Sequence, residues 1–125
     1  MNRIVFIFLV ALSFSLPASA ALNVFATVPE WASLVKEIGG SRVSVYSATH
    51  GLQDPHRIEA KPSLIARARA AKLVFATGAD LEIGWLPIVL RESGNREIQV
   101  GQPGYFEAAS VVGMLEVPKV LDRAQ

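Results

Sequence analysis

The sequence predicts an α/β fold, a parallel sheet with flanking helices. Three observations carry this prediction. Short apolar runs recur along the chain, amphipathic segments of helical spacing separate them, and prolines and glycines mark the segment ends. A strand followed by a helix and another strand is the repeating unit of parallel sheets. With 125 residues, the chain is long enough for one small domain and too short for two well-developed ones.

The first strand-helix-strand unit is predicted over residues 22–47. Residues 22–27 are apolar and β-favouring, which indicates a buried strand. Apolar side chains at positions 31, 34, 35 and 38 then have the i, i+3, i+4, i+7 spacing of a helix over 29–38. Pro29 at its start and glycine after its end are typical helix boundaries. Residues 42–47 alternate in polarity and predict the second strand.

The second half of the chain continues the alternation. Pro62 and Ser63 predict the start of a helix that runs to residue 71, because proline tolerates the first helical turn and serine can cap a free amide. Residues 73–76 are apolar throughout, which indicates a central strand covered on both faces. We expect three further elements: a helix over 81–91 with Pro87 at its start or at a kink, a strand over 97–100, and a short helix over 107–115.

Composition excludes several kinds of partner and site. There are 12 Lys and Arg residues against 11 Asp and Glu, so no excess of positive charge indicates nucleic acid or an anionic membrane surface. The chain has no cysteine, so neither a disulfide nor a thiolate ligand is available.

Residues 1–20 have the features of a secretory signal peptide. Arg3 gives a positive start, residues 4–15 are largely apolar, and Ala18-Ser19-Ala20 supplies the small residues of a cleavage site. The apolar stretch is shorter than the roughly 18 residues of a spanning helix. We therefore expect export and cleavage, leaving residues 21–125 as the mature chain.

A candidate ligand lies where this fold is expected to bind. In open parallel sheets, ligands bind beyond the carboxyl ends of the strands, and the predicted strand ends are followed by residues 27–29, 50–56 and 77–80. The second of these segments contains Asp54-Pro55-His56, in which proline restricts the backbone before the histidine. Neutral imidazole is the commonest protein metal ligand. His56 is therefore either a metal ligand or a solvated loop residue.

Other polar residues are weaker candidates. His50 lies six residues before His56, a spacing that matches no standard ligand pair. Asp54 either stabilises the turn or orients the imidazole of His56, and Asp80 either caps the following helix or hydrogen-bonds into a site. Glu59 is expected on the surface. The sequence contains no nucleophile elbow, no His-Glu-x-x-His helix and no phosphate-binding glycine loop, and we expect no enzymatic activity.

Several motifs occur in a defined order along the chain. They are the strand-helix opening at 24–31, Asp54-Pro55-His56, Lys61-Pro62-Ser63, the segment 71–82 and Gly84-Trp85-Leu86. In this order they resemble the periplasmic metal-binding proteins of zinc and manganese ABC importers. The resemblance covers nearly all of residues 21–125, and the combination is far more specific than any single motif.

The resemblance implies two α/β lobes joined by a long helix, with the ion held between them by about four ligands. His56 corresponds to the histidine of the family's Asp-Pro-His motif, and the other ligands would lie beyond Gln125. We therefore expect residues 21–125 to be the incomplete amino-terminal lobe of such a protein, either a truncated product or a fragment. Since a closed site needs several ligands, this part alone is expected to bind metal weakly or not at all.

The function implied is capture of Zn²⁺, with Mn²⁺ as the alternative ion, and its delivery to the membrane permease of an ABC importer. The protein would be periplasmic and monomeric, with no nucleic-acid partner. Two other classes stay open at this point. One is an exported metal-dependent hydrolase in which His56 holds a catalytic ion, and the other is a surface adhesin.

Overall fold

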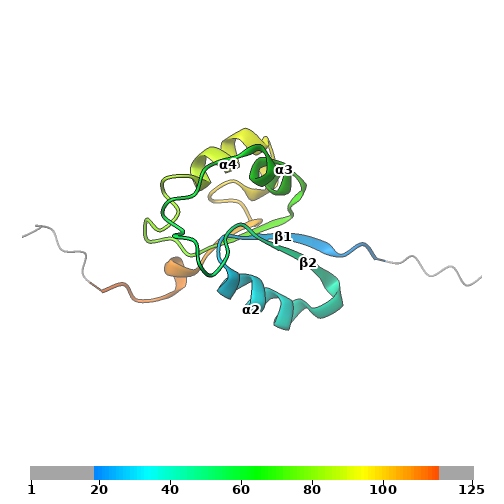
Figure 1. The fold of residues 1–125 in the computed structure, drawn as a ribbon. Helices are drawn as coiled ribbons and strands as arrows, with labels where there is room; N and C mark the ends of the chain where they lie inside the picture. The colour runs from blue at the N-terminus through cyan, green and yellow to red at the C-terminus, as the bar shows by residue number, and fades with distance from the viewer. Residues whose placement is uncertain (1–18, 116–125) are drawn as a thin grey trace, which may run out of the picture.

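A computed structural model describes residues 19–115, which form a sheet with helices on both faces (Figure 1). All neighbouring strands are parallel, and their order is β2-β1-β3-β4. The predicted α/β class is therefore confirmed. The predicted signal segment lies almost entirely outside the described residues. The strands are β1 (Leu22–Ala26), β2 (Val43–Ser47), β3 (Leu73–Ala76) and β4 (Tyr105–Glu107).

Three helices cover the sheet. Helix α2 (Pro29–Gly39) lies on one face, and α3 (Pro62–Ala70) and α4 (Leu86–Ser93) lie together on the other (Figure 1). Each begins with proline in its first turn, where the missing N–H would have no helical partner. The first three strands and the helices α2 and α3 lie within one or two residues of the ranges predicted from sequence.

The main core lies between the sheet and the α3–α4 pair. Its largest members are completely buried, and both inner strands, β1 and β3, contribute side chains to it. Apolar side chains that are far apart in the sequence meet in this core, so it joins the first and second halves of the described chain. The completely buried large residues are Phe25, Leu64, Val74, Trp85, Val89 and Ile98.

Helix α4 is shorter than predicted. The sequence indicated a helix over 81–91, but residues 80–85 form turns and the helix begins at Leu86. Pro87 explains the difference, because inside a longer helix its ring would clash with the carbonyl of residue 83. The turn left ahead of α4 lies at the carboxyl end of β3.

The prediction of a strand over 97–100 is wrong. A short 3-10 helix, Arg96–Ile98, replaces it and buries Ile98 completely in the core. The edge strand is β4 instead, and Gly104 lets it approach, since a Cβ there would lie 2.8 Å from the carbonyl oxygen of Lys72. The predicted helix over 107–115 is also wrong, because β4 includes Glu107 and only the 3-10 turn Ala108–Val111 follows.

The strand order places a topological switch at β1 and β3. The chain moves from β1 to β2 on one side and then returns to β3 on the other side of β1. At such a point the loops after the two strands diverge and leave a crevice at their carboxyl ends. Within residues 19–115, no helix is long and apolar enough to cross a membrane.

Candidate metal-binding site

A buried carboxylate lies at the carboxyl ends of β1 and β3. The side chain of Glu82 accepts hydrogen bonds from Thr27 Oγ1 at 2.6 Å, the Thr77 amide at 2.8 Å and the Gly78 amide at 3.0 Å. Glu82 is only 3% exposed. Thr49 Oγ1 also donates to the Thr27 carbonyl, at 2.9 Å. These bonds tie the ends of both strands and the start of the next loop into one rigid edge.

The Asp54-Pro55-His56 segment forms a tight turn in the loop between β2 and α3. Asp54 Oδ1 accepts a hydrogen bond from the His56 amide at 3.0 Å, and His56 Nδ1 lies 3.0 Å from the same oxygen. Arg57 closes the turn with its amide on the Asp54 carbonyl at 3.0 Å. Asp54 therefore fills both roles considered from sequence, stabilising the turn and contacting the imidazole.

Electrostatics favour the ionised form of Asp54. The His56 amide, and after it the His56 side chain, donate to this carboxylate and hold the pKa of Asp54 below its ordinary value. An ionised carboxylate can only accept hydrogen bonds, so the Nδ1 of His56 is the donor in this pair.

This pairing leaves the other ring nitrogen of His56 available. With the proton on Nδ1, Nε2 carries the free lone pair, and the side chain is 62% exposed. A histidine that donates its second N–H to a carboxylate is the usual arrangement of a metal-ligating imidazole. His56 thus fits the role of a ligand to a divalent metal ion.

The turn is attached to the body of the molecule through Trp85. The indole N–H of Trp85 donates to the Pro55 carbonyl at 2.8 Å, although the two residues are 30 positions apart in the sequence. Gly84 also lies against the turn, since a Cβ at this position would come within 3.3 Å of the His56 carbonyl oxygen. The turns before α4 therefore support the loop that carries His56.

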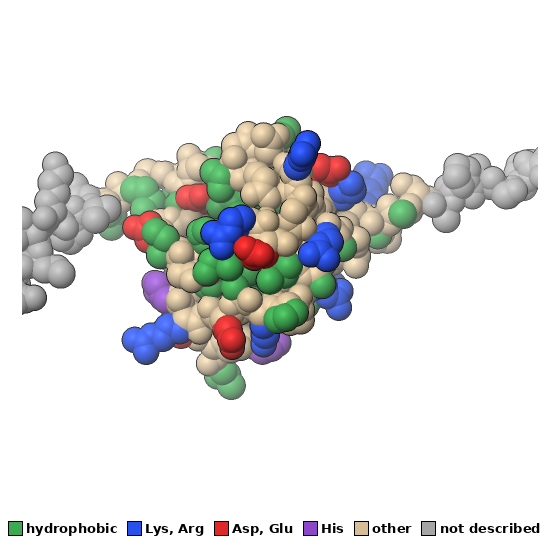
Figure 2. Space-filling view, turned by 90° about the horizontal axis from the view of Figure 1, so that it is seen from above, with side chains coloured by type: hydrophobic (Ala, Val, Ile, Leu, Met, Phe, Trp, Pro, Cys, Tyr) green, Lys and Arg blue, Asp and Glu red, His purple; other side chains and the backbone are tan. Residues whose placement is uncertain are grey.

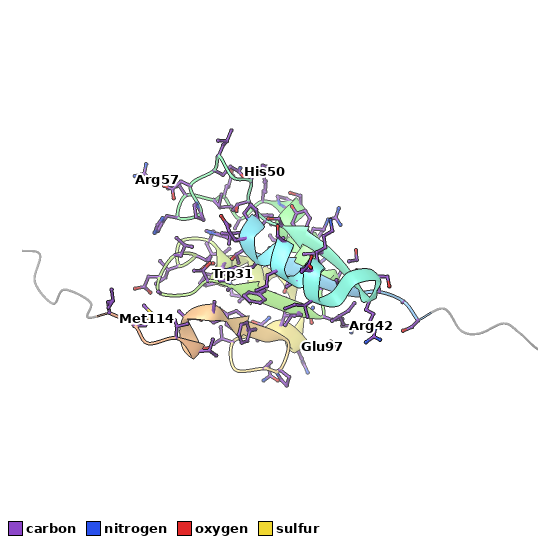
Figure 3. All side chains as sticks on the ribbon, turned by 90° about the horizontal axis from the view of Figure 1, so that it is seen from below. Trp31, Arg42, His50, Arg57, Glu97 and Met114 are labelled. Atoms are coloured by element: carbon purple, nitrogen blue, oxygen red, sulfur yellow. The ribbon has the colours of Figure 1, made fainter. Side chains whose placement is uncertain are left out.

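The structure does not bring the second histidine to His56. The amide of His50 donates to Gln53 Oε1 at 2.9 Å, and its side chain lines a separate cavity of about 420 Å³ between α2 and β2. The two histidine side chains lie apart in Figure 2. Figure 3 places His50 and Arg57 on one loop that projects from the body of the molecule.

Three acidic residues lie near the carboxyl ends of β3 and β4. Asp80, Glu82 and Glu107 line a cavity of about 340 Å³ together with apolar residues of α4. Tyr105 Oη lies 3.2 Å from Glu107 Oε2, and burial, followed by the charge of Glu107, raises the pKa of Tyr105 to about 12. Asp80 does not cap α4, which begins six residues later at Leu86.

Nowhere in residues 19–115 do three or more His, Asp or Glu side chains gather closely enough to hold a metal ion. Glu59 is exposed, as predicted. Sequence reasoning assigned no role to Glu82, Thr27 or Thr77. The available signal was the position of both threonines directly after apolar strands, together with a glutamate in the following turn.

The fold and site together define a class of protein. It is an α/β binding lobe that presents an exposed, carboxylate-paired histidine at the carboxyl edge of a parallel sheet. Residues 24–116 match the family described as zinc-uptake complex component A, periplasmic, and the chain belongs to this family. The family resemblance inferred from the motifs is thus confirmed, and the family is one of transport binding proteins rather than enzymes.

Similar proteins agree with this assignment. The chain is 31% identical over 83 residues to the manganese ABC transporter substrate-binding lipoprotein scaA of Streptococcus gordonii, covering 64% of this chain and 27% of that protein. It is 28% identical over 101 residues to the manganese ABC transporter substrate-binding lipoprotein PsaA of Streptococcus pneumoniae, covering 78% of this chain and 31% of that protein. The chain therefore spans between about a quarter and a third of these relatives.

A crystal structure of ZnuA is similar in fold. The TM-score is 0.65 at 24% sequence identity, and the similarity covers 78% of this chain and 36% of that structure.

Proposed function

We propose that this chain is part of an exported substrate-binding protein that captures Zn²⁺ and delivers it to the membrane permease of an ABC importer. The observation that carries the proposal is the Asp54–His56 pair, which fixes the imidazole and leaves Nε2 open to a cation. Membership of a zinc-uptake family supports the direction of transport and the class of cargo. Residues 1–20 would direct export to the periplasm and then be removed.

The capture step needs no bond-making beyond coordination. His56 supplies one neutral nitrogen ligand, and Asp54 increases the basicity of that ligand and fixes its tautomer. Zinc sites use about four ligands, so we propose that the others come from outside residues 19–115. Imidazole suits Zn²⁺, whereas Mn²⁺ favours oxygen ligands, and Mn²⁺ is the alternative cargo because the relatives include manganese transporters.

The experiment is a calorimetric titration of Zn²⁺ and Mn²⁺ into the full-length mature protein. His56→Ala is expected to weaken zinc binding more than about 100-fold, because it deletes a ligand, and Asp54→Asn about 10- to 100-fold, because it deletes the partner of that ligand. His50→Ala is the matched control and is expected to leave the affinity unchanged. Residues 21–125 alone are expected to bind weakly.

Three results would each contradict a different part of the proposal. Equal zinc affinity in the wild type and His56→Ala would remove His56 from the site. Failure of the full-length protein to bind either ion would overturn the carrier function itself. Tighter binding of Mn²⁺ than of Zn²⁺ would reassign the cargo.

A further inference from the structure

We propose that Trp85 is a positioning residue for His56, acting through its hydrogen bond to the Pro55 carbonyl. The proposal rests on the proposed function of His56 as a metal ligand. It assigns to a buried core tryptophan a task in preorganising the binding site, in addition to its packing.

This bond attaches the His56 turn directly to the core, whereas the chain just after the turn is attached by the packing of Ile58 and Ala60 against the core. The side chains of Asp54 and His56 are 51% and 62% exposed, so packing does not hold them. The bonds between Asp54, His56 and Arg57 shape the turn but are all local. Among the described residues, the Trp85–Pro55 bond is the one hydrogen bond that joins residues 50–60 to a distant element.

The donor is itself fixed. The side chain of Trp85 is completely buried, and its ring centroid lies 6.5 Å from that of Phe25 on β1. Its amide donates to the Glu82 carbonyl at 3.2 Å, while the Glu82 carboxylate is bound to the ends of β1 and β3. A continuous set of contacts therefore runs from the central strands through Glu82 and Trp85 to the residue before His56.

The physical consequence concerns preorganisation. A ligand held in its bound position loses less conformational entropy when the ion arrives, and partners that orient a ligand typically change metal affinity 10- to 100-fold. Trp85 does not contact the His56 ring in this way; its indole N–H holds the backbone carbonyl of Pro55, the residue before His56. We therefore expect its indole N–H to account for about a tenfold difference in zinc affinity.

The test compares Trp85→Phe with Trp31→Phe in the full-length protein. Phenylalanine keeps an aromatic ring at position 85 and removes the N–H. Trp31 is the control because it is the other tryptophan and its indole N–H also bonds at this edge of the sheet, but to Thr77 Oγ1 at 2.8 Å instead of to the turn. Two quantities are measured: ¹⁵N order parameters of the metal-free protein at Asp54, His56 and Arg57, and the zinc dissociation constant.

Trp85→Phe is expected to lower the order parameters from about 0.85 toward about 0.6 and to weaken zinc binding about tenfold, whereas Trp31→Phe changes neither. The proposal would be overturned if Trp85→Phe left the order parameters unchanged, or if it lowered them without weakening zinc binding. It would also be overturned if Trp85→Phe and Trp31→Phe had equal effects. If the wild type binds no zinc, the proposed function fails, and the order parameters still decide whether Trp85 holds the turn.

A second variant leaves the core ring in place, in case Trp85→Phe does not fold. Gly84→Ala adds a Cβ at 3.3 Å from the His56 carbonyl oxygen, a distance at which the turn must shift by a few tenths of an ångström. Gly51→Ala, in the loop that carries His56, is its control, because a Cβ there meets nothing within 4 Å. We expect shifted His56 resonances and weaker zinc binding only in Gly84→Ala, and identical behaviour of the two variants would overturn the proposal.

Discussion

Replacing Glu82 by glutamine tests the rigid edge on which the candidate site is built. Glutamine has nearly the same shape, so the cavity that alanine would leave is avoided. With its oxygen toward Thr27 and Thr77, the amide keeps two of the three bonds in weaker, neutral form. Its NH₂ group then faces the Gly78 amide, which loses its acceptor.

The expected cost follows from these bonds. A buried donor without a partner costs about 1–3 kcal/mol, and a charge-assisted hydrogen bond is worth about 1 kcal/mol more than a neutral one. Removing the buried charge offsets part of this destabilisation, because the desolvation penalty of the carboxylate disappears. We expect Glu82→Gln to lower the free energy of unfolding by about 3 kcal/mol.

Urea denaturation at neutral pH measures this change, with Glu59→Gln as the control at an exposed glutamate and an expected effect below about 0.5 kcal/mol. Thr27→Val removes one donor to Glu82 at nearly constant volume. The double variant with Glu82→Gln should be less destabilised than the sum of the single variants by about 1 kcal/mol. A Glu82→Gln protein within about 0.5 kcal/mol of the wild type, or strict additivity with Thr27→Val, would refute the reasoning.

Two further predictions concern β4. The phenol of Tyr105, with its pKa raised to about 12, should ionise well after a free tyrosine in an absorbance titration. Since the unfolded chain releases this proton near its ordinary pKa of 10.0, the contribution of Tyr105 to stability is complete below pH 10 and is lost as the pH rises toward 12; ionisation at the ordinary value would contradict this. Gly104→Ala should destabilise the protein by about 2–3 kcal/mol in urea denaturation, because its Cβ would overlap the carbonyls of Lys72 and Glu97. Gly113→Ala, which meets nothing within 4 Å, is the control, and equal stability of the two variants would show that β4 can move away.

The sequence was sufficient where local signals agreed with the final packing. The run at 73–76 is apolar and bounded by polar residues, and the structure has β3 at these positions. The sequence was insufficient where contacts with residues distant in the sequence decided the local structure. The segment around Ile98 has strand-like residues, yet it forms a 3-10 turn because Ile98 inserts into the core and Asn95 fixes the segment to the end of α3, donating to the Ala71 carbonyl at 2.7 Å.

The local features of the candidate site could be predicted from the sequence, but its long-range contacts could not. His56 could be found from its neighbours and its place after β2, because the position of a loop follows from the alternation of strands and helices. Its pairing with Asp54 is local and was among the alternatives considered. The roles of Glu82 and Trp85 could not be derived, since they depend on β1 lying beside β3 and on the β2–α3 loop lying against the turn before α4.

The placement of the two tryptophans also gives this protein an optical reporter. The chain contains only Trp31 and Trp85, so Trp31→Phe leaves a single indole whose N–H touches the carbonyl preceding His56. Indole emission responds to the hydrogen bonding and solvation of that ring. Its fluorescence would therefore follow any displacement of the His56 turn in real time, without an attached dye.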